Sequence, residues 1–330
     1  MNSDKPRDYS IDILKCLAAL LVTHSHFENV YGDYAVLATG GSFGDCLFFF
    51  CSGYTLLLSR RNLNFANWYK RRISRIYPTV FSWALLLALF FHSHMNMAEI
   101  LLYGGGFFVS CIMVFYVLFY GIKKFVCGRN MLAVMAGVFL LCWAAYPFVD
   151  KGDVDAMYKW QWSLYFIPML LGAMLGKQYA VASTTIDSST KKIVMLLSGL
   201  VVSVAAYYIF MHYINTVRQC DFFRPLIILP QLGVTVCFYL LCRTSFAERL
   251  YSNRYCYAFI RFVGGLCLEI YIVQPIIIRN WPLTELFPLN VVIVFLIIVF
   301  SAYVLKCLSH VWSQTFKETD YNWQEIVKPW

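Results

Sequence analysis

The sequence is poor in charge. Only 14% of its 330 residues are Asp, Glu, Lys or Arg, and 60% are hydrophobic, whereas soluble globular domains carry about a quarter charged residues. These proportions exclude an ordinary soluble domain and indicate a polytopic membrane protein. Seven stretches contain no charged side chain, and each is close to the ~20 residues that cross a bilayer as a helix: residues 76–98, 100–122, 130–149, 160–176, 193–217, 225–242 and 286–305.

These stretches also lack the alternation of apolar and polar residues that is typical of transmembrane β-strands. The expected fold class is therefore all-α, with about ten transmembrane helices. We expect a single integral membrane domain over residues 1–330, because no polar segment is long enough to form a core of its own. The expected helices cover residues 11–27, 43–58, 76–97, 100–122, 130–149, 160–176, 193–213, 225–242, 258–278 and 286–305.

Positive charge is distributed unevenly between the expected loops. With the N-terminus inside, 21 of the 27 Lys and Arg residues fall on the cytoplasmic side and five on the outer side, and Lys15 lies within the first helix. This bias is typical of multi-pass proteins of the cell (inner, cytoplasmic) membrane, and it predicts that both termini are cytoplasmic. The net charge of +9 then reflects topology, and no nucleic-acid partner is expected.

Two chemical signatures are missing as well. The twelve cysteines form no CxxC pair and have no metal-ligand spacing, so neither a metal nor a disulfide is predicted. No GxSxG nucleophile elbow is present, although Ser52 and Gly53 stand in the apolar run FFFCSGYTL. Close helix packing or a local break at this small pair is the favoured interpretation, ahead of a catalytic serine.

Four polar residues stand out in the expected first helix: Asp12, Lys15, His24 and His26. Intramembrane ionisable groups usually face the bundle interior or a wet cavity. At about 100° per residue, His26 falls on nearly the same helix face as Lys15 and close to Asp12, whereas His24 lies about 180° away. His26 is therefore the better candidate for an internal site. Alternatively, Asp12 and Lys15 pair at the interface and the histidines hydrogen-bond to other helices.

A cluster of cations precedes the expected third helix. For Arg60, Arg61 and Lys70, anchoring of a cytoplasmic loop at lipid headgroups is the favoured interpretation. Arg72 and Arg75 are spaced i and i+3 and lead directly into the apolar run that follows, so they would share a helix face. Guanidinium groups bind phosphate in a bidentate manner, so the pair suits a phosphorylated ligand from the cytosol, with headgroup anchoring as the alternative.

Glu269, in the segment CLEIYIVQP, is interpreted as the only acid well inside an apolar run. It could orient His26 or face a polar cavity. Alternatively, it could lie near the cytoplasmic end of its helix and pair with Arg261.

Three motifs, in order within the first 80 residues, resemble the membrane-bound acyltransferase 3 family. YSIDILKCLAALLVTHSHF is similar to the family's first helix, whose spacing from its Asp to the catalytic histidine leads from Asp12 to His26. FFFCSGYTL is similar to a family segment that contains Ser-Gly followed by Tyr or Phe. YKRRISRIYP is similar to the family signature Arg-x-x-Arg-Ile-x-Pro, matching at Arg72 and Arg75.

The resemblance implies transfer of an acyl group, acetyl from acetyl-CoA, to a hydroxyl of a surface or cell-envelope glycan or a lipid-linked saccharide. It implies that His26 is the catalytic base, or carries the acyl group transiently. Arg72 and Arg75 would bind the acyl-CoA. The remaining candidates near substrate or cofactor are Lys15, Ser52 and Glu269, with Asp12, Gly53 and Tyr54 in support. Lys15, Ser52 and Tyr54 are the candidate donors to the developing negative charge of the thioester carbonyl.

The sequence departs from the family pattern at Gln274, where a histidine is common, and at FYVLFY in the expected fourth helix, where Trp-(Tyr/Phe)-Leu is common. The first departure removes a possible polar partner. The alternative function is a polytopic transporter or a lipid or glycan flippase without acyl-transfer activity, which accounts equally well for ten helices with internal charges. It does not account for the spacing of Arg72 and Arg75.

Overall fold

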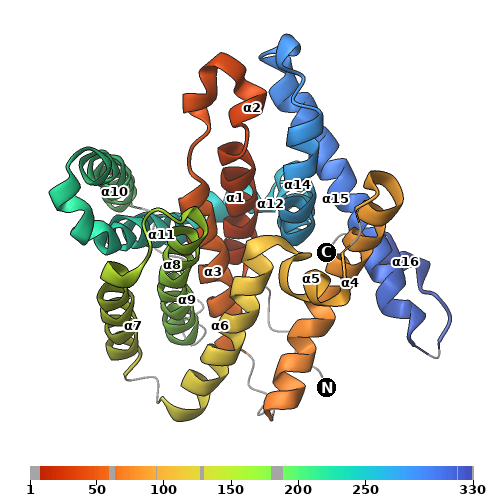
Figure 1. Ribbon diagram of the computed structural model, residues 1–330, viewed down its shortest axis with the longest axis horizontal. Coiled ribbons are helices and arrows are strands. Elements are labelled where there is room, and N and C mark those ends of the chain that lie inside the picture. Colours follow the sequence, from red (N-terminus) through yellow and green to blue (C-terminus); the bar gives the residue numbers. More distant parts are fainter. Residues whose placement is uncertain are drawn as a thin grey trace. The chain divides into compact units, whose positions relative to one another are not determined.

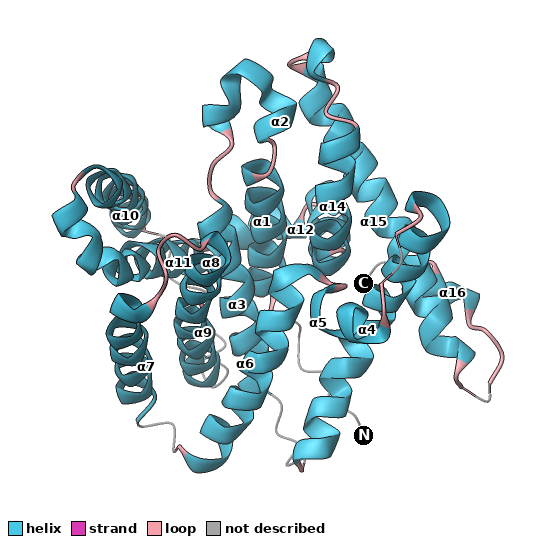
Figure 2. Cartoon of the chain, in the orientation of Figure 1, coloured by secondary structure: helices cyan, strands magenta, loops and turns pink. Residues whose placement is uncertain are grey.

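The computed structural model describes residues 8–58, 64–93, 95–126, 130–179, 189–317 and 319–328. Helices joined by short connections make up these residues, and none of the described residues belongs to a β-strand (Figure 2). The expected all-α class is therefore confirmed. Arg60 and Arg61, and both chain ends, lie outside the described residues.

The α-helices and 3-10 helices follow one another along the chain, and Figure 1 labels most of the α-helices. Their bounds are α1 (Tyr9–Ser25), α2 (Glu28–Tyr31), η1 (Gly32–Leu37), α3 (Gly41–Leu58), α4 (Phe65–Phe91), α5 (Met97–Tyr103), α6 (Gly106–Phe125), α7 (Met131–Ala145), η3 (Tyr146–Phe148), α8 (Val154–Leu164), α9 (Phe166–Tyr179), α10 (Thr190–Thr216), η4 (Arg218–Ile227), α11 (Ile228–Cys242), α12 (Ser245–Ser252), α13 (Arg254–Gly265), α14 (Cys267–Asn280), η5 (Thr284–Leu286), α15 (Leu289–Thr315) and α16 (Trp323–Ile326).

Within the described residues, six helices are long and apolar enough to cross a membrane, and two bent helix pairs raise the number to eight. The multi-pass character is therefore confirmed, although ten spans are not reached by this measure. The apolar run over residues 100–122 divides between α5 and α6 at Gly104 and Gly105, and the run over residues 160–176 divides at Tyr165. Gly106 has a φ of +70°, which glycine adopts without strain. The apolar composition of these runs thus indicated segments that lie in lipid, but it did not show that each run would be divided between two helices.

α4 begins eleven residues before the expected start at residue 76. The Asn64 side chain caps it by accepting a hydrogen bond from the Asn67 backbone N–H at 2.9 Å, as good N-caps do. Arg72 and Arg75 therefore lie inside a regular helix rather than in a loop before one. This placement holds the two cations on a rigid element.

The chain forms two compact units, and neither is a continuous segment. Unit 1 comprises Met1–Ala18, Ser42–Arg60 and Val126–Arg261, and unit 2 comprises Ala19–Gly41, Arg61–Phe125 and Phe262–Trp330. α1 contributes to both units. The candidate residues divide accordingly: Asp12, Lys15, Ser52, Gly53 and Tyr54 belong to unit 1, and His26, Arg72, Arg75 and Glu269 to unit 2.

Unit 1 is held together by a close approach of α3 to α9. A Cβ added to Gly53 would overlap the backbone of Met169, and one added to Gly172 would overlap the backbone of Phe50. Glycine on both helices therefore lets the two backbones touch, as small residues do in membrane helix pairs. α10 and α11 also lie side by side in unit 1, and α15 packs against α14 and α4 in unit 2 (Figure 1).

We expect Gly53→Ala and Gly172→Ala each to destabilise the protein by about 2 kcal/mol, because the added methyl meets backbone that cannot rotate away. Gly137→Ala on α7 is the matched control, since nothing lies within 4 Å of its added Cβ. That change should be neutral or slightly stabilising, because alanine is the better helix former. The thermal unfolding midpoint of the purified protein in detergent measures each effect. Equal midpoints for all three variants would contradict the close approach.

Candidate active site

The structure places His26 just beyond the helix that was expected to contain it. α1 ends at Ser25, and the His26 backbone N–H donates to the Thr23 carbonyl at 3.1 Å in a tight turn. The helix-face argument that paired His26 with Lys15 therefore does not apply, because regular helical rotation stops before His26. The imidazole of His26 is exposed and makes no hydrogen bond or ion pair with any other described residue.

His24, by contrast, is held in place. Its Nδ1 lies 2.9 Å from the Thr39 carbonyl oxygen. Because a carbonyl only accepts hydrogen bonds, Nδ1 carries the proton, and in the neutral ring Nε2 keeps the lone pair. The ring also packs edge-on against Tyr31. His24 lines an apolar groove of about 290 Å³ in unit 2, with Leu20, Thr23, Phe27, Val291, Val292 and Phe295.

Gln274, which stands where the family often has histidine, is fully buried beside the end of α1. The Thr23 hydroxyl donates to Gln274 Oε1 at 2.9 Å, whereas Gln274 Nε2 is buried without a hydrogen-bond partner. This bond ties α14 to the end of α1, directly before the two histidines. Gln274 therefore helps to position the end of α1 through Thr23, whereas a histidine at this place would supply a different polar partner.

Arg72 rests on aromatic side chains of unit 2. Its guanidinium carbon lies 4.6 Å from the centroid of a Trp68 ring and 5.5 Å from that of Tyr116, within the range of a cation–π interaction. Trp68 itself is buried, and its indole N–H donates to the Tyr116 carbonyl at 3.3 Å. The guanidinium therefore lies over a rigid aromatic platform. Arg72 Nε is buried and lacks a hydrogen-bond partner.

A second cation shares this platform. Lys123, at the end of α6, places its ammonium 5.1 Å from the Trp68 ring centroid, and Arg75 is exposed on α4. Neither Trp68 nor Lys123 was predicted from the sequence. The i, i+4 spacing of Trp68 and Arg72 within one helix would have indicated the first contact, whereas the second depends on the approach of α6. The two arginines thus differ: Arg72 is anchored, and Arg75 faces outward.

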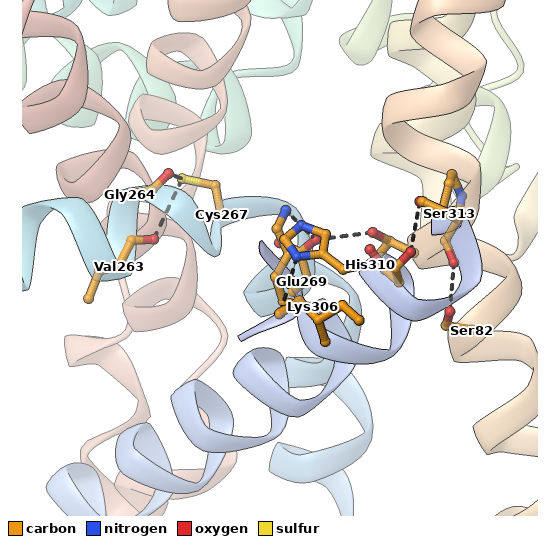
Figure 3. Close-up of polar contacts among 12 residues, drawn as sticks. Ser82, Val263, Gly264, Cys267, Glu269, Lys306, His310 and Ser313 are labelled. Atoms are coloured by element: carbon orange, nitrogen blue, oxygen red, sulfur yellow. Dashed lines mark hydrogen bonds and ion pairs between the residues drawn. The ribbon is translucent and has the colours of Figure 1, made fainter. Parts of the chain in front are cut away.

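Glu269 is fully buried in unit 2 and pairs with Lys306. Its Oε1 accepts from Lys306 Nζ and from the Thr79 hydroxyl, each at 3.0 Å, as Figure 3 shows for the lysine. Glu269 Oε2 is buried without a partner. The alternative that Glu269 pairs with Arg261 is wrong. Lys306 was missed because it lies 37 residues further along the chain.

Arg261 pairs instead with Asp12 in unit 1, at 3.4 Å. Asp12 Oδ2 also accepts from the Tyr251 hydroxyl at 2.8 Å. Burial raises the pKa of Tyr251 to about 12, with a further contribution from Asp12, so the phenol stays protonated and remains a donor. Asp12 therefore anchors α12 and α13 to α1. Lys15 is half-buried three residues further along α1.

The Ser52-Gly53 pair lies inside an unbroken α3. Its role in close packing follows from the contact of Gly53 with α9, and the alternative of a local helix break does not apply. Tyr54 donates its hydroxyl proton to Asp8 Oδ2 at 2.6 Å. A phenol that already donates to a carboxylate is a poor donor to a thioester carbonyl, whereas Ser52 is half-buried and polar.

Asp45 was also missed, and Glu269 is therefore not the only acid well inside an apolar run. Asp45 follows Gly44 in the second turn of α3. The signal was present in the sequence FGDCLFFF, where one carboxylate interrupts an apolar segment. Sequence analysis overlooked it because the residue lies close to the expected start of the helix at residue 43.

A family model described as an acyltransferase domain matches residues 8–310, a range that contains every candidate residue above. The chain belongs to the acyltransferase 3 family. It is therefore a membrane acyltransferase, and the transporter alternative is set aside. Searches of curated proteins and of solved structures each returned no significant match. Among the residues that the structure describes, no group of three His, Cys, Asp or Glu side chains is arranged to hold a metal ion.

We expect the replacement of Lys306 and the replacement of Glu269 to destabilise this acyltransferase by different amounts. Lys306→Met should cost about 3 kcal/mol, because it leaves a fully buried carboxylate without its countercharge. Glu269→Gln should lower the free energy of unfolding by less, because the Lys306 side chain is 21% exposed and its ammonium can reach water. The thermal unfolding midpoints of both variants and of the double variant measure this difference. A Glu269→Gln variant less stable than Lys306→Met would show that the carboxylate does not depend on Lys306.

Proposed function

We propose that this membrane acyltransferase moves an acetyl group from cytosolic acetyl-CoA to a hydroxyl of a surface or cell-envelope glycan, or of its lipid-linked precursor. It would work as a multi-pass protein of the cytoplasmic (inner) membrane, with both termini in the cytoplasm. The observation that carries the proposal is the family match together with an arginine pair at the family's spacing, one member of which rests on a rigid platform.

Arg72 and Arg75 would bind the phosphates of acyl-CoA. Guanidinium groups match phosphate geometry in a bidentate manner, and an arginine stacked on Trp68 loses little side-chain freedom when it binds. Lys123 beside the same ring adds a third positive charge. No carboxylate forms an ion pair with Arg72 or Arg75 among the described residues, so an anionic ligand would not have to displace one.

His26 would act as general base. Its imidazole accepts the proton of the acceptor hydroxyl while that oxygen attacks the thioester carbonyl. The tetrahedral intermediate then expels the CoA thiolate, which takes the proton from the imidazolium. The exposed, unengaged ring of His26 suits this exchange, whereas His24 is tied to Thr39 and better suited to shaping the turn. Lys15 and Ser52 belong to unit 1, and their role as carbonyl donors stays a prediction.

We expect His26→Ala to lower acetyl transfer at least 100-fold, in line with the loss of a general base, and His24→Ala to lower it less than tenfold. The measurement is base-labile acetate on surface glycans of a deletion strain complemented with each variant at equal membrane expression. Acetate that survives in His26→Ala but not in His24→Ala would reverse the assignment. Acetate that the wild-type protein fails to restore would contradict O-acetyl transfer.

We expect Arg72→Lys to raise the KM for acetyl-CoA about tenfold and to leave kcat within twofold. Lysine keeps the charge but loses the flat contact with Trp68 and the bidentate fork. Arg71→Lys, at the exposed neighbouring position, is the matched control and should leave KM unchanged. Release of free CoA by the purified protein gives both constants. A KM unchanged in Arg72→Lys would remove Arg72 from the donor site.

A further inference from the structure

Asp45 is a carboxylate without a partner in unit 1. It lies on α3 between Phe43 and Phe49, both of which are buried, and no other described residue forms a hydrogen bond or ion pair with it. The other acids of the expected first and ninth helices, Asp12 and Glu269, are each paired with a cation. Asp45 keeps an intermediate exposure, so its carboxylate has lost part of its hydration without gaining a partner, and a ligand that donates hydrogen bonds to it would be favoured.

The Asp45 side chain remains partly accessible. It keeps an intermediate exposure, and no charged side chain among the described residues forms an ion pair with it. Tyr158, on α8 of the same unit, is 47% exposed.

Aromatic rings form a wall beside Asp45, because Phe49 lies four residues further along α3 and shares its helix face. Burial, and after it the charge of the Asp45 carboxylate, raises the pKa of the Tyr158 phenol. Tyr165 stacks on Phe49 with ring centroids 5.7 Å apart and meets Trp162 edge-on at 5.5 Å. These three rings are buried and belong to two elements, α3 and the α8–α9 junction, so the wall is rigid.

Hydroxyl groups lie one helical turn away from Asp45. Ser42, three residues before it on α3, donates to the Tyr207 hydroxyl at 2.8 Å, and Tyr207 is half-buried. Residues at i and i+3 share a helix face, so Ser42 and Asp45 face the same side of α3. The site therefore combines a strong hydrogen-bond acceptor, neutral hydroxyls and flat apolar rings.

We propose that Asp45, Tyr158 and the Trp162–Tyr165 wall form a binding site for a neutral polyhydroxylated ligand, the sugar of the acceptor. Sugar hydroxyls donate to a carboxylate without bringing charge into the protein, and the C–H faces of a sugar ring pack on aromatic rings. The absence of a nearby cation among the described residues argues against an anionic ligand. This inference rests on the proposed function, because that function supplies a glycan as acceptor.

The test is direct binding, which does not depend on acetyl transfer. The probe is the saccharide released by mild acid from the glycan of the deletion strain, titrated by calorimetry into the full-length protein in lipid nanodiscs. We expect wild type to bind, and Asp45→Asn to bind at least tenfold more weakly while CoA release without acceptor stays within twofold. Asp155→Asn, an exposed acid on α8, is the matched control and should bind as wild type does.

Saccharide binding that is equal in Asp45→Asn and wild type, or absent from wild type, would overturn the proposal. Binding of tetramethylammonium in place of the saccharide would also overturn it, in favour of a cation site. Loss of both saccharide binding and CoA release in Asp45→Asn would indicate a structural role and overturn it as well. If wild type binds the saccharide but restores no acetate in cells, the proposed function fails and the binding site stands.

Discussion

An ionised side chain among apolar helices loses several kcal/mol of hydration unless another group replaces the water, and two long-range ion pairs of this acyltransferase are placed accordingly. In unit 1, Asp12 is held by Arg261 and Tyr251. In unit 2, Glu269 is held by Lys306 and Thr79. Both pairs join helices that are remote in the sequence. With so few charges in the chain, each pair fixes the position of a whole helix against another.

The functional candidates are polar side chains that are not paired with an opposite charge. Arg72 has aromatic faces in place of a carboxylate, which leaves its charge available to an anion. Asp45 shares its face of α3 with Ser42 and Phe49, and no described cation forms an ion pair with it. His26 is exposed and unengaged, whereas its neighbour His24 is fixed by Thr39. A membrane protein that pairs its structural charges and leaves these groups open keeps hydrogen-bonding capacity for ligands.

The sequence indicated several of the site residues, but it did not predict the structural environment of each. His26 was selected by helix geometry and by family spacing, and only the spacing survives, because α1 ends one residue earlier. Ser52-Gly53 was interpreted as a packing pair, and the contact of Gly53 with Met169 on α9 explains why. Arg72 and Arg75 were expected at the mouth of a helix but lie within it, since Asn64 caps α4 well upstream. For Glu269, the alternative partner Arg261 lies on α13, whereas Lys306 on α15 holds the carboxylate.

Hydrophobic runs, their lack of alternation and the spacing of three short motifs were enough to establish an all-α membrane protein of the acyltransferase 3 family. These features are local, because a helix in lipid satisfies its own backbone and shows its period in a few turns. The partners of Asp12 and Glu269, the platform under Arg72 and the isolation of Asp45 emerged only in the folded chain. Most of them depend on which helices touch. Arg72 and Trp68 share one helix, but Arg261, Lys306 and Lys123 reach their partners from other helices, and neither helix of such a pair identifies the other in its own sequence.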